Sequence, residues 1–153
     1  DCHMPYVSEG AAKFSSHDVH SPLLNPEAAC GQCHTDSEYV VRRVNLTQEQ
    51  VATTKQNTED ALIDAISAIQ AAAADPNADA ELLDQARKLH RKAQFMWDFV
   101  SAENSTGFHN PEYALKILAE STNLARQAQM LAAQSVDDMS LLQTGIYYQT
   151  AGQ

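Results

Sequence analysis

The sequence predicts a mainly α fold, in which a loop-rich segment over residues 1–45 precedes a bundle of three long helices over residues 46–153. Apolar side chains recur at three- and four-residue steps over residues 46–74, over residues 79–103 and after Asn110, which is the pattern of amphipathic helices. The first segment lacks this periodicity and holds three of the five prolines, all three cysteines and four of the six histidines. Short connections predict that successive helices run in opposite directions.

The first helix is predicted over residues 46–74 from its apolar stripe and from signals at both ends. Thr47 and Gln50 fit a capping box. The helix is expected to end at Asp75, because the residue before Pro76 avoids helical geometry. The expected stripe comprises Val51, Thr54, Thr58, Leu62, Ala65, Ile66, Ile69 and Ala73.

The second and third helices are predicted from their caps as well as their stripes. Asp79 or Asn77 can cap the second helix. Asn110 caps the third, with Pro111 at its first position and Glu112 in its first turn. The second stripe comprises Leu82, Leu83, Ala86, Leu89, Ala93, Met96, Trp97 and Val100, and the third comprises Ala114, Ile117, Leu118, Ser121, Leu124, Ala125, Ala128, Leu131 and Ala132.

These helical faces predict close packing, within the chain or across a dimer, because they are nearly heptad in spacing and rich in alanine. The aromatic run over residues 95–99 is expected in the core or in an interface. The tail from Val136 lacks a strong pattern and ends in an apolar stretch, residues 145–148, that could dock onto another surface.

Charge and hydropathy restrict the possible partners. The formal net charge is −10 and the sequence pI is about 4.8, so no basic stripe is available for nucleic acid. No stretch is long and apolar enough to span a membrane.

The motif with the most specific chemistry is Cys30-Gly31-Gln32-Cys33-His34. A Cys-x-x-Cys-His run is the attachment signature of a c-type haem: both thiols bond to the porphyrin vinyl groups, and the adjacent imidazole binds the iron. Zinc is the competing interpretation, but it requires two further Cys or His ligands in a similar cluster.

A second signal stands at the start of the chain, where Asp1-Cys2-His3 matches the end of another such motif. We therefore expect the chain to be the C-terminal fragment of a longer multihaem cytochrome c, with residues 1–45 as its haem-binding segment. Haem attachment accounts for all three cysteines, so no disulfide is needed. Covalent attachment of haem outside the cytoplasm predicts a periplasmic location.

The other histidines have less specific surroundings. His17 and His20 fit either a surface pair or a site in which at least one binds iron opposite a proximal histidine. His90 lies beside an apolar stripe and is expected at the edge of the core or on the surface. His109, taken alone, is typical of an exposed loop histidine before a helix cap.

The chain resembles, over nearly its whole length, the C-terminal part of the ammonia-forming pentahaem cytochrome c nitrite reductases. Two haem signals, an intervening histidine and a distant Gly-x-His-Asn-Pro occur in the family's order. The matching stretches are residues 2–6, 16–17, 21–23, 30–34, 93–99 and 107–111.

The resemblance implies the sites of covalent attachment. Cys2 and His3 would belong to the family's fourth haem, with His3 as the proximal ligand. Cys30, Cys33 and His34 would hold the fifth haem, whose distal ligand would lie upstream.

The resemblance also implies two distal ligands. His17 corresponds to the distal ligand of the second haem, and His109 to that of the fourth, opposite His3. His20 matches no ligand of the family, which favours His17 within that pair.

For the whole enzyme, the resemblance implies six-electron reduction of nitrite to ammonium at a lysine-ligated haem upstream, near calcium ligands that also lie upstream. No catalytic residue is expected in this chain, whose haems would transfer electrons. The helices would form a homodimer interface. The electron donor would be a membrane-anchored quinol-oxidising cytochrome or a soluble multihaem cytochrome, so association with the cytoplasmic membrane would be through a partner.

Three alternatives remain at this point. A non-catalytic multihaem electron carrier would have only histidine-type attachment motifs upstream, whereas an octahaem nitrite- or hydroxylamine-processing enzyme would have eight motifs in total. A purely structural helical dimerisation module accounts for residues 46–153 but leaves residues 1–34 unexplained.

Overall fold

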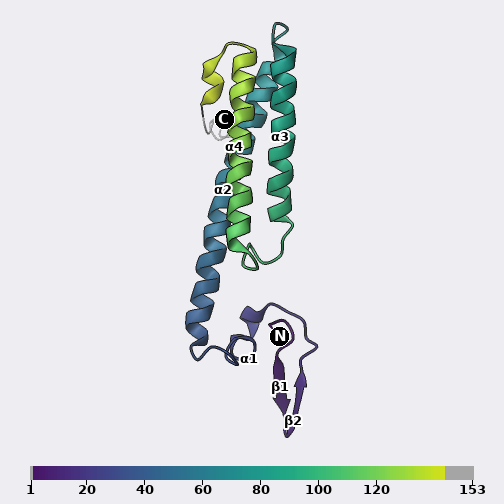
Figure 1. Ribbon diagram of the computed structural model, residues 1–153, viewed down its shortest axis with the longest axis vertical. Helices are drawn as coiled ribbons and strands as arrows, with labels where there is room; N and C mark the ends of the chain where they lie inside the picture. The colour runs from purple at the N-terminus through teal and green to yellow at the C-terminus, as the bar shows by residue number, and fades with distance from the viewer. Residues whose placement is uncertain (1, 144–153) are drawn as a thin grey trace, which may run out of the picture. The chain divides into compact units, whose positions relative to one another are not determined.

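The computed structural model describes residues 2–143 and confirms a mainly α fold with three long helices (Figure 1). The chain divides into two compact units, Asp1–Thr47 and Gln48–Gln153. In chain order the elements are β1 (Tyr6–Glu9), β2 (Ala12–Ser15), η1 (Pro22–Leu24), α1 (Pro26–Ala29), α2 (Ser37–Ala74), α3 (Ala80–Ser101), α4 (Pro111–Ser135) and η2 (Met139–Leu142). No helix among residues 2–143 is long and apolar enough to cross a membrane.

The first unit contains a small antiparallel hairpin that the sequence reading missed. Strands β1 and β2 pair from Tyr6 opposite Ser15 to Glu9 opposite Ala12. Gly10 stands first in the two-residue loop with φ 58°, a conformation that glycine adopts without steric cost. Strands this short show too little alternation to predict from sequence.

Helix α2 begins at Ser37, so the predicted start at residue 46 and the capping box there were wrong. The Thr47 hydroxyl donates to the carbonyl oxygen of Arg43 one turn earlier, at 2.9 Å, so Thr47 lies inside the helix. The actual cap is Asp36, whose carboxylate accepts the N–H of Tyr39 at 2.7 Å. An aspartate at this position satisfies a backbone donor that the first helical turn leaves unpaired.

The caps of the other two helices are as predicted. Asp79 accepts the N–H groups of Glu81 and Leu82 at the start of α3. The Asn110 side chain accepts the N–H of Tyr113 at 3.2 Å, and Pro111 is the first residue of α4.

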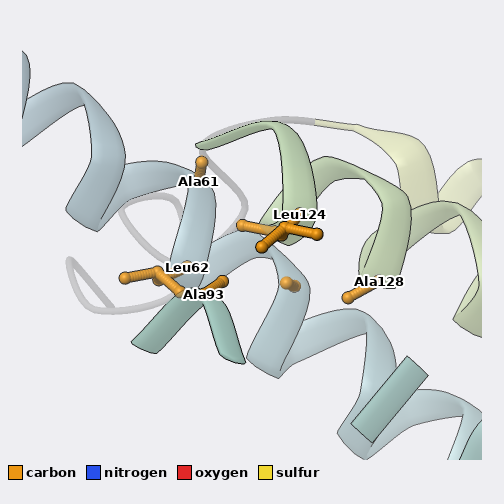
Figure 2. Packing of buried hydrophobic residues seen from close by; sticks show 7 residues of the cluster. Ala61, Leu62, Ala93, Leu124 and Ala128 are labelled. Atoms are coloured by element: carbon orange, nitrogen blue, oxygen red, sulfur yellow. The ribbon is translucent and has the colours of Figure 1, made fainter. Parts of the chain in front are cut away.

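In the second unit, α2 from Gln48 onward packs with α3 and α4 around an alanine-rich core, and α3 runs antiparallel to both α2 and α4 (Figure 1). Figure 2 shows Ala61 and Leu62 of α2 with Ala93 of α3 and with Leu124 and Ala128 of α4. The small side chains allow close approach of the helix backbones, and the leucines fill the space between them.

Two details of the predicted faces need correction. Ala73 is exposed, whereas Ala61, Ala68 and Ala72 are buried, because consecutive alanines give no polarity contrast from which a face can be assigned. In the aromatic run, Trp97 is half-buried and its Nε1–H donates to the carbonyl of Lys55 at 3.2 Å. Phe95, however, is 68% exposed and so lies outside the chain's own core.

The segment after α4 docks on the bundle. Gln129 is buried, and its amide donates to the carbonyl of Leu141 in η2 at 2.8 Å. The apolar stretch at residues 145–148 lies outside the described residues.

Candidate functional site

The Cys30–His34 motif is a single helical turn at the end of α1. Asn25 begins α1 by accepting the N–H of Ala28, and Cys30 is its C-terminal cap. The carbonyl of Cys30 then accepts the N–H groups of Cys33 at 3.1 Å and His34 at 2.9 Å. These two backbone bonds close one turn of the chain, so Cys30, Cys33 and His34 lie within a single turn.

Neighbouring residues hold this turn in place. A Cβ at Gly31 would lie 2.5 Å from the carbonyl oxygen of Glu27, so only glycine allows the backbone this approach. The Gln32 side chain donates to the carbonyl of Tyr6 at 2.9 Å, and Ser37 donates to the Glu27 carboxylate. The turn is therefore tied both to the hairpin and to the start of α2.

No disulfide joins the three cysteines: Cys2 and Cys33 are exposed, and Cys30 is half-buried. Burial, together with the neighbouring Cys2 and Glu27, raises the pKa of the Cys30 thiol above its ordinary value. Across residues 2–143, no three His, Cys, Asp or Glu side chains gather as a metal site.

His3 is oriented by a backbone carbonyl. Its Nδ1 lies 3.0 Å from the carbonyl oxygen of His20, which can only accept, so the ring proton is on Nδ1 and the lone pair is on Nε2. The ring of His20 bonds in turn to the carbonyl of Asp18 at 2.6 Å. His20 thus contributes its backbone to His3, while His17 lies exposed in the segment after β2.

His109 stands in the loop that joins α3 to α4 (Figure 1), where the carboxylate of Glu103 organises the backbone. One oxygen of Glu103 accepts the N–H of Ser105 at 2.8 Å, and the other accepts the N–H of Gly107 at 2.8 Å. The same oxygen that bonds Ser105 lies 3.0 Å from Nδ1 of His109. The Ser105 hydroxyl also accepts the backbone N–H of His109 at 3.0 Å.

Glu103 is ionised at neutral pH. Its burial favours the neutral acid, but hydrogen bonds from Ser105, Gly107 and His109 outweigh burial and lower the pKa of Glu103 to about 2. A carboxylate accepts and cannot donate, so Nδ1 of His109 carries the proton and the lone pair of the neutral ring is on Nε2.

An apolar hollow of about 150 Å³ adjoins His109. The rings of Phe99 and Tyr113 beside it meet edge to face, with centroids 6.4 Å apart. This volume is below that of ordinary small-molecule pockets.

His90 has a different environment. It is half-buried on α3, and burial lowers the pKa of its imidazole. Within the described part of the chain, its Nε2 has no hydrogen-bond partner. These features agree with the predicted histidine at the edge of the core.

Comparison with known proteins decides the family. The cytochrome c552 family model matches residues 1–149. The chain belongs to the cytochrome c552 family. It is 41% identical over 143 residues to the cytochrome c nitrite reductase subunit NrfA of Nitratidesulfovibrio vulgaris, which covers 88% of this chain and 27% of that protein. It is 33% identical over 133 residues to cytochrome c-552 of Parabacteroides distasonis, covering 87% of this chain and 27% of that protein.

A solved structure gives the same result. The chain superposes on the cytochrome c nitrite reductase of Desulfovibrio desulfuricans, a catalytic subunit described with two calcium sites, with a TM-score of 0.84 and 39% identity. The match covers 92% of this chain and 31% of the other. The predicted resemblance to the cytochrome c nitrite reductases is confirmed, and membership of a cytochrome c family implies haem c as the cofactor.

The cytochrome c552 relatives are much longer than this chain, which spans about a quarter of the length of those named above. The ligand assignments for Cys2, His3, His17, His34 and His109 stay predictions, as does the pairing of His109 with His3. Sequence reasoning missed Glu103, although a glutamate just after a helix and followed by Ser105 and Gly107 is a recognisable loop signal.

Proposed function

We propose that this chain is the C-terminal, electron-transferring part of a cytochrome c nitrite reductase that reduces nitrite to ammonium with six electrons. The observation that carries the proposal is the Cys30-x-x-Cys33-His34 motif, which forms a single turn of the chain in a member of the cytochrome c552 family. The catalytic lysine-ligated haem and the calcium ligands would lie outside this chain.

The residues of the first unit fit haem. Only Pro5 and Val44 are buried among residues 2–47, while Tyr6 is 51% exposed and Leu24 is 75% exposed. So little buried side-chain surface cannot offset the conformational entropy of ordering such a segment. A porphyrin would supply the apolar surface that this unit lacks.

The proposed roles follow from the chemistry of each side chain. Cys30 and Cys33 would each add S–H across a vinyl group to form a thioether, and His34 would bind the iron. Cys2 and His3 would serve a second haem in the same way, with Nδ1 of His3 held by the carbonyl of His20. Haem c with histidine on both faces supplies one-electron transfer and offers nitrite no open coordination position.

His17 and His109 would be distal ligands. For His109, support comes from Nδ1, which is held by the ionised Glu103 and thereby leaves Nε2 as the donor atom of the ring. His109 would bind the iron opposite His3.

The helices would also form a homodimer. The proposal rests on the family resemblance, and Phe95 of α3 and Met130 of α4, which are 68% and 45% exposed, are candidate contacts for the partner. The protein would be periplasmic and would receive electrons from a membrane-anchored quinol-oxidising cytochrome or a soluble multihaem cytochrome.

Covalent attachment is tested by acid–acetone extraction of the native-length holoprotein. We expect haem to remain on a peptide that contains Cys30 and Cys33, and we expect Cys30→Ser with Cys33→Ser to remove that haem only. Extraction of this haem together with two alkylatable thiols at 30 and 33 would contradict the proposal. Activity is tested separately with a reduced dye: ammonium should form from nitrite, whereas an electron carrier would yield none.

Replacing His109 by alanine is expected to remove one low-spin signal from the electron paramagnetic resonance spectrum of the holoprotein, because one iron loses a strong axial ligand. Nitrite should still bind at the catalytic haem, while turnover slows. His90→Ala is the matched control, since His90 lies on the bundle without a predicted ligand role. If His109→Ala keeps every low-spin signal, His109 is not a ligand.

A further inference from the structure

We propose that Glu103 is the positioning residue of His109, fixing the direction of its imidazole and increasing its electron donation to iron. The inference rests on the proposed ligand role of His109. It begins with the 3.0 Å contact between a Glu103 carboxylate oxygen and Nδ1 of His109.

The carboxylate is fixed before it meets the ring. Both of its oxygens accept backbone N–H groups, from Ser105 and Gly107, each at 2.8 Å. The loop is in turn held on α2, where the Gln48 side chain donates to the carbonyl of Ser105 at 2.9 Å. These bonds fix the position of the Glu103 carboxylate, which in turn directs the imidazole that bonds to it.

The backbone of His109 is fixed by the same loop. Its N–H donates to the Ser105 hydroxyl at 3.0 Å, and Asn110, the next residue, caps α4. With the backbone held on both sides, the bond from Nδ1 to Glu103 restrains both side-chain torsions of the imidazole. The Nε2 lone pair therefore has one direction, which is the requirement for a preorganised metal ligand.

The negative charge of the Glu103 carboxylate also affects how strongly His109 would bind iron. An imidazole that donates Nδ1–H to a carboxylate is a stronger base at Nε2, and a stronger ligand stabilises the oxidised iron. His3 provides a contrast within the chain, because its Nδ1 donates to the neutral carbonyl of His20 at 3.0 Å. The two histidines proposed for one iron therefore differ in the charge of their hydrogen-bond acceptors.

The test compares Glu103→Gln with Glu112→Gln in the native-length holoprotein, using redox titration followed by electron paramagnetic resonance. Glu112 is exposed in the first turn of α4, three residues after His109, so its replacement removes an equal charge nearby. For Glu103→Gln we expect all low-spin signals to remain, one haem midpoint potential to shift upward and the g values of that haem to change. Glu112→Gln should leave both readouts at the wild-type values.

A third variant, His109→Ala, tests the ligand role of His109 separately from the positioning role of Glu103. If His109→Ala removes a low-spin signal while Glu103→Gln leaves potentials and g values unchanged, the role of Glu103 is overturned and that of His109 survives. Equal shifts in Glu103→Gln and Glu112→Gln would also overturn it, since charge alone would then account for the effect. If His109→Ala keeps every low-spin signal, the ligand role itself fails and the role of Glu103 fails with it.

If Glu103→Gln does not accumulate as holoprotein, the haem midpoint potentials are measured in Glu103→Asp instead. Aspartate keeps the charge but withdraws the carboxylate by one methylene, so the hydrogen bond to Nδ1 lengthens or breaks. The same haem should again shift upward in potential, and an unchanged potential would overturn the proposal.

Discussion

Replacing Leu62 by aspartate is expected to lower the free energy of unfolding of the helical bundle by about 3–5 kcal/mol. Leu62 is 3% exposed and packs where α2, α3 and α4 meet (Figure 2). The substitution removes its apolar contacts and places a carboxylate among alanines and leucines, with no cation provided to pair with it. Leu124→Asp on α4, at 8% exposure in the same cluster, should act in the same direction.

Chemical denaturation of the holoprotein, followed by helical circular dichroism, measures the effect. Ala73→Asp is the matched control on the same helix, because Ala73 is exposed. A surface substitution there should change the free energy of unfolding by about 0.5 kcal/mol or less. Wild-type unfolding of Leu62→Asp, or equal losses in both α2 variants, would mean that the buried face of α2 is misassigned.

The two helix starts that were predicted correctly depend on local chemistry. Asp79 and Asn110 each bond backbone N–H groups two or three residues away, so a short stretch of sequence contains the whole interaction. The predicted start of α2 was wrong because Thr47 and Gln50 fit the same local capping pattern. Thr47 instead bonds back to Arg43 within a longer helix, an alternative that residue types alone do not exclude.

The interior of the bundle also contains polar contacts that no periodicity indicates. Asp64 is 5% exposed and accepts a hydrogen bond from Arg126 at 2.7 Å. Its carboxylate is tolerated at this depth because the guanidinium pairs with it. The two residues lie on different helices and far apart in sequence, so the pairing follows from the packing.

In the candidate site, too, chemistry carried by neighbouring residues could be predicted and contacts between distant residues could not. The Cys30–His34 motif is contiguous, so sequence alone predicts haem attachment there, whereas the turn that it forms was not predicted. The bond from His3 to the carbonyl of His20 joins distant residues through the backbone, and a backbone acceptor has no sequence signature. Glu103 meets His109 across a loop in which Thr106 and Gly107 both have positive φ, 52° and 76°, and the sequence does not specify that path of the backbone.

Replacing Gly107 by alanine is expected to cost roughly 2–5 kcal/mol and to disturb the loop that holds His109. About 1–2 kcal/mol comes from placing a residue with a Cβ at φ 76°. About 1–3 kcal/mol more comes from overpacking, because the new Cβ would lie 2.8 Å and 2.9 Å from the two methyl carbons of Val51. Val51 is 1% exposed on α2 and, as a β-branched helical residue, has little rotamer freedom with which to yield.

A double-mutant cycle in the holoprotein isolates the contact. Val51→Ala alone should cost about 1–3 kcal/mol through the lost methyl groups. In Gly107→Ala/Val51→Ala the two shortest contacts of the new Cβ are removed, and the Cβ of residue 51 remains 3.2 Å away. The combined loss should therefore be smaller than the sum of the single losses by more than about 0.5 kcal/mol. Gly10→Ala is the control for conformation alone, since Gly10 has φ 58° and its added Cβ meets nothing within 4 Å. Additive losses in the cycle would show that the close approach of the loop to α2 does not contribute, and that the backbone angle alone requires glycine at position 107.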